Sequence, residues 1–346
     1  MQIHLQEASR LPGTVSLPNT SLLAVARHMF SLHRQMKLQE QKCKEEIPEL
    51  IAAIIPPDQF SFSSKDILRI TKYYQLALNL VCDNVYQLAG KELNTREHRN
   101  ILLLSVFLPL FDDLFDDRLL NYPQIEALIN DPEVYTPANT IDSIVQNLYV
   151  QLLREIPAPD RFTQYLKEVA YWELQSLKQF NREIPEEELT QITYNKSFYS
   201  ILLFCSVLEF DPGAAMNALL YPVSGLMQLT NDVFDVWKDL QKSLYTIPNL
   251  YWNYEKLKTM FLNEINSINN QVAQMTYPES NRKNFLIRTH ALNAMGWMSL
   301  QQLREVAVQK PFSEASRKEL VCDMDSLPRQ LRWVGYVRQL CNTGKK

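Results

Sequence analysis

The stretch FLPLFDDLFDDR, residues 107–118, places four aspartates directly after a long apolar run. On a helix Asp112 and Asp116 lie one turn apart on one face, and Asp113 and Asp117 lie on the adjacent face. Four carboxylates this close repel one another, and at the end of a buried helix they cost stability unless cations neutralise them. A ligand set made only of oxygens favours a hard divalent cation, Mg²⁺ first.

A second acidic stretch, LTNDVFDVWKDL at residues 229–240, also follows an apolar run. Asn231, Asp235 and Asp239 stand at positions i, i+4 and i+8, so a helix aligns them over consecutive turns of one face. Lys238 lies beside this column and is expected to meet an anion. If the two stretches face each other across a bundle, they form a clamp in which Mg²⁺ ions hold a diphosphate.

The rest of the chain predicts a single all-α domain. Apolar residues recur at three- and four-residue spacings, strand-like alternation is scarce, and the breaks are short and marked by proline. Residues 1–20 are expected to form a flexible N-terminal segment and residues 21–346 one helical domain. Expected helices cover residues 20–56, 66–93, 95–118, 138–155, 160–182, 186–209, 213–243, 250–274, 279–308 and 313–341.

Composition excludes several functional classes. The seven glycines are isolated from one another, so neither GxGxxG nor GxxxxGK[ST] can be built, which argues against Rossmann and P-loop nucleotide sites. The net charge is −4, with 35 Lys and Arg against 39 Asp and Glu, which argues against nucleic acid as a partner.

The sequence also predicts the cellular location of the protein. No uncharged apolar run reaches 18 residues, so no membrane span is expected. The five cysteines are an odd number without a CxxC pair, and no apolar signal region follows the N-terminus. A reducing, cytoplasmic location is therefore expected.

Together the two acidic stretches resemble the class I terpenoid synthases. FDDLFDD is similar to the aspartate-rich DDxx(D/E) motif of that family, with Asp117 as an additional acid. NDVFDVWKD is similar to the second motif, (N/D)Dxx(S/T)xxx(E/D), and departs from it where Asp235 replaces Ser or Thr and Asp239 replaces Glu. The separation of 119 residues between Asp112 and Asn231 is also similar.

This resemblance implies a single antiparallel helical bundle with a central apolar cavity. The motifs would flank its mouth and bind three Mg²⁺ ions, with Asp112, Asp113, Asp116, Asp117, Asn231, Asp235 and Asp239 as ligands. The metals would remove diphosphate from an acyclic C15 or C20 prenyl diphosphate, with C20 preferred, and the resulting carbocation would cyclise. A homodimer is compatible with such an enzyme.

Further substrate-binding residues are candidates with weaker support. Arg182, 49 residues before Asn231, and Lys196 are the candidates for sensing diphosphate. Arg332 and Tyr336, one turn apart near the C-terminus, are the candidates for closing the site, although an ordinary C-terminal helix explains them equally well. Helical spacing from the motifs also adds candidates for the cavity wall: Gln228, Phe111 and Leu108.

Other interpretations stay open. Chain-elongating prenyltransferases carry a GGKR-type site and paired arginines, whereas this chain has AGKE at residues 89–92 and a single Arg118. Head-to-head condensing enzymes of the squalene and phytoene type have QLTN before a DxxxD motif, which residues 228–239 also match. A non-catalytic helical scaffold with acidic docking patches is the third alternative. A di-iron carboxylate bundle is disfavoured, because Glu-x-x-His does not occur.

Overall fold

The computed structural model describes residues 17–56, 60–116, 118–211 and 213–344. Within these ranges the secondary structure is helical and contains no strand, which confirms the predicted all-α class. Most of the N-terminal segment predicted to be flexible, residues 1–16, lies outside the described residues. No helix in the described ranges is long and apolar enough to cross a membrane.

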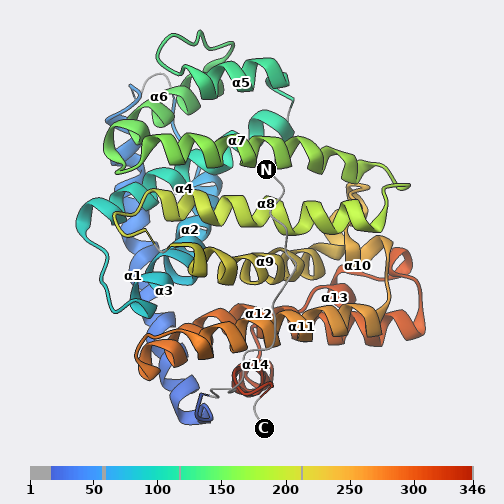
Figure 1. Cartoon of the computed structure of the whole chain (residues 1–346). Helices are drawn as coiled ribbons and strands as arrows, with labels where there is room; N and C mark the ends of the chain where they lie inside the picture. Colours follow the sequence, from blue (N-terminus) through green and yellow to red (C-terminus); the bar gives the residue numbers. More distant parts are fainter. Residues whose placement is uncertain (1–16, 57–59, 117, 212, 345–346) are drawn as a thin grey trace.

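The bundle is built from long helices joined by short connections (Figure 1). The helices are α1 (Leu22–Ala52), α2 (Ser64–Leu76), α3 (Asp83–Leu88), α4 (Thr95–Asp116), α5 (Tyr122–Asn130), α6 (Thr140–Glu155), α7 (Pro159–Ser176), α8 (Glu186–Ser206), α9 (Gly213–Gln241), α10 (Ile247–Leu250), α11 (Tyr254–Gln274), α12 (Glu279–Gln309), α13 (Arg317–Leu320) and α14 (Leu327–Cys341).

The central helices are stacked in a fixed order. Helix α8 packs between α7 and α9, α9 packs against α12 and α11, and α14 covers the other side of α12 (Figure 1). Helix α4 packs against α2 and α6, and α1 runs along one side of the bundle against α2 and α14. Helices α4, α8 and α9 thus occupy the interior, as their nearly continuous apolar sequences predict.

Two predicted helices are interrupted in the structure. Residues 66–93 were expected to form one helix, but a π-helix (Ala77–Cys82) separates α2 from α3. Residues 313–341 were also expected to be one helix, yet they form a 3₁₀ turn (Phe312–Glu314), α13 and α14. A new helix start with Pro328 in its first turn explains the second break. Helix α5 was not predicted; it begins at a capping box between Asn121 and Gln124.

Glycine lets α9 approach its two neighbours closely. A Cβ atom on Gly225 would lie 2.3 Å from the ring of Tyr194 on α8. A Cβ atom on Gly296 of α12 would lie 2.3 Å from the hydroxyl oxygen of Thr230 on α9. These contacts fix how α9, which carries the second acidic motif, sits between α8 and α12.

Candidate active site

The first acidic motif forms the C-terminal end of α4. Asp113 accepts hydrogen bonds from both terminal nitrogens of Arg69 on α2, each at 2.9 Å. Asp112 is half-buried. Its negative charge, together with the burial of Tyr73, raises the pKa of Tyr73, and the Tyr73 side chain also forms a hydrogen bond with Asp112. Asp116 is the last residue of α4, and Asp117 lies outside the described residues. Helix α2 therefore supplies a basic and a phenolic partner to this motif.

The second motif lies in the C-terminal half of α9, as predicted. Asp235 pairs with Lys238 at 2.9 Å, and Asp239 is buried. Asn231 is exposed, whereas the neighbouring Asp232 is buried. Of the amide and acidic side chains in this stretch, those at 228, 232, 235 and 239 are thus at least partly buried, whereas the expected column was 231, 235 and 239.

The two motifs lie within electrostatic range of each other. The hydrogen bond from Lys238 to Asp235 raises the pKa of Lys238, and the positive charge of Arg69 opposes this rise. Arg69 is itself bound to Asp113, and its hydrogen bonds go to the end of α4. That the motifs confront each other across the bundle stays a prediction.

Helices α7 and α8 contribute a buried ion pair to the same region. The Lys196 ammonium lies 2.5 Å from a carboxylate oxygen of Glu173, which is only 3 % exposed. The charge of Glu173 contributes to the raised pKa of Tyr73, and the charge of Lys196 acts on Asp232. Lys196, predicted to bind diphosphate, is therefore brought close to both motifs.

Asp232 shows that this region is suited to a cation. Burial and the charges of Asp239 and Asp235 raise its pKa to about 7, against a lowering effect of the hydrogen bond from Gln228. Its second carboxylate oxygen is buried and has no hydrogen-bond partner among the described residues. Burial and the charge of Asp235 likewise raise the pKa of Asp239 to about 7. Burial and mutual repulsion thus outweigh the charge of Lys196 at Asp232 and the charges of Lys238 and Lys242 at Asp239, and an oxygen-binding metal fits that chemistry.

A ready-made coordination sphere is not present among the described side chains, where no three His, Cys, Asp or Glu residues are gathered closely enough to hold a metal. Basic residues hold two of the expected ligands instead, since Arg69 binds Asp113 and Lys238 binds Asp235. Any metal must displace these partners or share the carboxylates with them.

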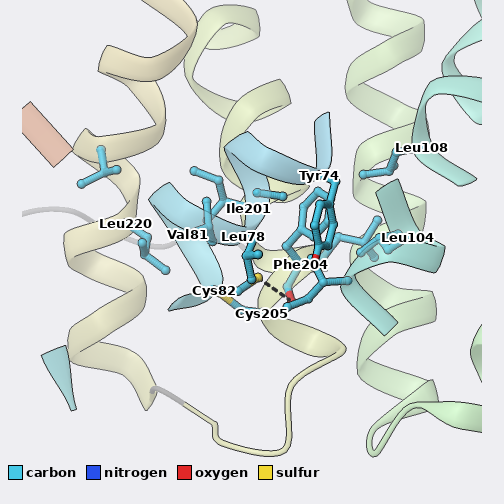
Figure 2. Close-up of a cluster of buried hydrophobic side chains, with 14 of the residues drawn as sticks. Tyr74, Leu78, Val81, Cys82, Leu104, Leu108, Ile201, Phe204, Cys205 and Leu220 are labelled. Atoms are coloured by element: carbon cyan, nitrogen blue, oxygen red, sulfur yellow. Dashed lines mark hydrogen bonds between the residues drawn. The ribbon is translucent and has the colours of Figure 1, made fainter. Parts of the chain in front are cut away.

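Apolar side chains fill the space beneath the motifs. Leu108 lies one turn before Asp112 and belongs to a buried cluster with Leu104, Tyr74, Leu78, Ile201 and Phe204 (Figure 2). Phe111 was expected to contact substrate, but it stacks on Phe107 at 5.3 Å between ring centroids, within an aromatic column that includes Tyr149. Phe111 is therefore a core residue. A groove of about 910 Å³ lies elsewhere, between α8 and α11.

Three predicted residues form no hydrogen bond or ion pair with the motifs in the described part of the chain. Arg182 is exposed in the connection between α7 and α8, close to the segment where Gln179 and Tyr245 exchange hydrogen bonds. Arg332 and Tyr336 lie on α14, which packs on α12 and α1 rather than on α9. The structure does not bring Arg332 and Tyr336 to the acidic motifs.

Four residues of this region were not predicted as site residues from the sequence: Arg69, Tyr73, Glu173 and Asp232. Asp232 belongs to the quoted motif but was not among the expected ligands at 231, 235 and 239. Glu173 carried a signal, because it is a lone acid on the apolar face of α7. Arg69 and Tyr73 are ordinary helix residues in sequence, and only the packing of α2 on α4 reveals them.

Comparison with known proteins gives little further information. No protein-family model and no curated protein matches the chain. Among solved structures, a dehydrosqualene synthase crystallised with a ligand is similar, with a TM-score of 0.44 and 16 % sequence identity. The match covers 89 % of this chain and 98 % of that chain.

Proposed function

We propose that this protein is a Mg²⁺-dependent enzyme that ionises an acyclic prenyl diphosphate and cyclises the resulting carbocation. The observation that carries the proposal is the position of Arg69. It binds Asp113 of the first motif and acts electrostatically on Lys238 of the second, although the two motifs are far apart in sequence. Two acidic motifs that each carry a basic partner, Arg69 on Asp113 and Lys238 on Asp235, suit a diphosphate held through metal ions.

Each group has a distinct role in this proposal. Asp112, Asp113 and Asp116 on one side and Asp235 and Asp239 on the other would hold Mg²⁺. When bound, the metal supplies positive charge to the departing diphosphate. Lys196 and Arg69 are placed to receive diphosphate oxygens once the metals occupy the carboxylates.

The surroundings of the site suit an unstable carbocation. The cluster below Asp112 is buried and largely apolar, and Tyr74 and Phe204 present aromatic rings within it beside the thiols of Cys82 and Cys205 (Figure 2). Exclusion of water prevents premature capture of the cation, and aromatic faces stabilise positive charge. An acyclic C15 or C20 chain, with C20 preferred, is the proposed occupant of this cluster after its side chains move apart.

The test is incubation of the purified protein with C10, C15, C20 and C25 prenyl diphosphates, with Mg²⁺ or with EDTA. The expected result is Mg²⁺-dependent release of diphosphate together with a cyclic hydrocarbon or alcohol. Asp112→Ala and Asp239→Ala should each lower turnover by at least 100-fold, since each removes a carboxylate from one side of the metal site. Glu305→Ala, an exposed acid on α12, is the matched control. Turnover in EDTA, or full activity in both aspartate variants, would refute the proposal.

Head-to-head condensation of two prenyl diphosphates is the second candidate. The exposure of Asn231 supports it, because that exposure leaves Asp235 and Asp239 as a DxxxD pair without a third ligand from the amide. The same incubation separates the two functions. Cyclisation preserves the carbon number of the substrate, whereas condensation doubles it to C30 or C40.

A further inference from the structure

The outward face of the N-terminal half of α1 combines large apolar side chains with positive charge. Leu23, Phe30 and Leu38 are 69 %, 74 % and 61 % exposed. Helical spacing places Arg27, Arg34 and Lys37 on the same side of the helix, and all three are exposed. We call these six residues the α1 face.

The opposite side of the same helix explains why this face is free. Val25, Met29 and Leu32 are buried against the bundle, at spacings of three and four residues. The α1 face therefore points away from the core, and α1 runs along one side of the molecule (Figure 1). A monomeric protein rarely exposes three large apolar side chains on one helical stripe without a partner for them.

The α1 face is unusual in its positive charge as well as in its exposed apolar side chains. The chain as a whole carries a charge of −4, yet α1 contains no Asp or Glu from Leu22 to Gln39. Within the described part of the chain, Arg27, Arg34 and Lys37 form no ion pair with a carboxylate. In contrast, Lys42 and Lys44 farther along α1 are paired with Glu46 and Glu40.

We propose that the α1 face binds the surface of a membrane that contains anionic lipids. Interfacial helices of this kind insert apolar side chains between lipid headgroups, while Arg and Lys contact the phosphates. An acidic protein surface offers the charge but not the apolar layer into which Leu23 and Phe30 would insert. This inference concerns a surface outside the acidic motifs and does not depend on the proposed catalytic function.

Helix α14, which packs against α1, has a related composition. It contains no acidic residue, and Leu327 and Leu331 are both about two-thirds exposed. The segment before α1 is fixed to the end of α14, because Asn342 donates to and accepts from the backbone of Thr20. The α1 face is thus anchored to the folded bundle and does not need to unfold to reach a membrane.

The test is co-sedimentation of the full chain with vesicles of phosphatidylcholine alone or with 30 % phosphatidylserine. The protein should bind the anionic vesicles at least tenfold more tightly than the neutral ones, and binding should weaken as salt rises. Each basic residue near an anionic surface contributes about fivefold, so R27Q/R34Q/K37Q should weaken binding on the order of 100-fold. L23S/F30S/L38S should weaken it at least tenfold.

Matched controls keep the result specific to this face. K42Q/K44Q removes positive charge from the same helix, and V134S/V308S removes exposed apolar side chains from other elements. Both controls should bind like the unaltered protein. Equal binding to both vesicle types, no binding to either, or retained binding by the α1-face variants would overturn the proposal. So would a dimer, seen by light scattering, that both α1-face variants dissociate, because the face would then be an interface between copies.

Discussion

Arg69 holds both carboxylate oxygens of Asp113, with a nitrogen–oxygen distance of 2.9 Å for each. A third hydrogen bond, 3.1 Å long, joins the same guanidinium to the carbonyl oxygen of Pro109, one turn earlier on α4. Asp113 is one of the expected metal ligands, so Arg69 and Mg²⁺ compete for the same two oxygens. The ion pair neutralises one carboxylate at the acidic end of α4 before a metal arrives.

This competition predicts that Arg69→Ala binds Mg²⁺ more tightly in the absence of substrate. Both partners are partly exposed, so the pair is worth about 0.5–1 kcal/mol, which corresponds to a gain in Mg²⁺ affinity of about two- to fivefold. Isothermal titration with MgCl₂ alone measures this change. Arg99→Ala, which removes a similar ion pair to Glu155, should leave the affinity unaltered. Weaker Mg²⁺ binding by Arg69→Ala would contradict the competition.

The buried carboxylate of Asp232 predicts a pH dependence of stability in metal-free protein. The pKa of Asp232 is about 7 in the folded state and 3.8 in the unfolded state. Between these two pH values the folded state therefore keeps a proton that the unfolded state has lost. Asp232 therefore stabilises the fold below about pH 4, and this contribution disappears as the pH rises to 7. Asp232→Asn should gain about 4 kcal/mol relative to the unaltered protein between pH 4 and pH 8.

Urea unfolding in EDTA at several pH values measures this gain. Glu305→Gln serves as control, because water solvates that exposed side chain in both states. Added Mg²⁺ at pH 8 should stabilise the unaltered protein more than Asp232→Asn. A difference in stability that does not vary with pH would show that Asp232 is not held in the protonated form.

The ion pair between Lys196 and Glu173 predicts how the free energy of unfolding changes when one or both of its charges are removed. Lys196→Met leaves the Glu173 carboxylate buried without its positive partner, and the free energy of unfolding should fall by about 2–4 kcal/mol. The double variant K196M/E173Q removes both charges and should recover most of that loss. Lys256→Met, which breaks an exposed pair with Glu186, should cost less than about 1 kcal/mol.

Turnover by the double variant then separates structure from binding. If Lys196 receives a diphosphate oxygen, K196M/E173Q should be folded but should show a raised KM for the prenyl diphosphate. An unchanged KM in a stable double variant would assign the pair a structural role only.

The sequence predicted the helices of both motifs, but not how far each helix is rotated about its axis. On α9 the expected column at 231, 235 and 239 and the observed column at 228, 232, 235 and 239 share two residues. Spacing alone cannot choose between them, because each forms a continuous stripe on a helix. The choice depends on the neighbours of α9, where Gly225 meets Tyr194 and Thr230 meets Gly296.

The residues that other helices add to the site could not be predicted from the sequence, for a related reason. Arg69 lies 44 positions before Asp113, and the π-helix that follows α2 changes the register of the chain without a clear mark in the sequence. Glu173 and Lys196 meet only because α7 and α8 pack side by side. A sequence motif identifies residues on one helix. Partners on a second helix can be named only when the packing of the two helices is known.

The contact between Gly225 and Tyr194 predicts how sensitive the second motif is to the spacing of α8 and α9. In Gly225→Ala the new methyl group would lie 2.3 Å from the Tyr194 ring, which must move or push the helices apart. Tyr194 is also held by a 2.9 Å hydrogen bond from its hydroxyl to Glu264 on α11, so it cannot turn away without losing that bond. The free energy of unfolding should fall by about 2–3 kcal/mol.

Gly335→Ala is the matched control: it also lies within a helix, but a Cβ atom there meets nothing within 4 Å. That substitution should stabilise the protein by about 0.5–1 kcal/mol, since alanine favours helix more than glycine. Thermal and urea unfolding of the two variants measure the difference, and equal stability of both would show that α8 and α9 are not in close contact at Gly225.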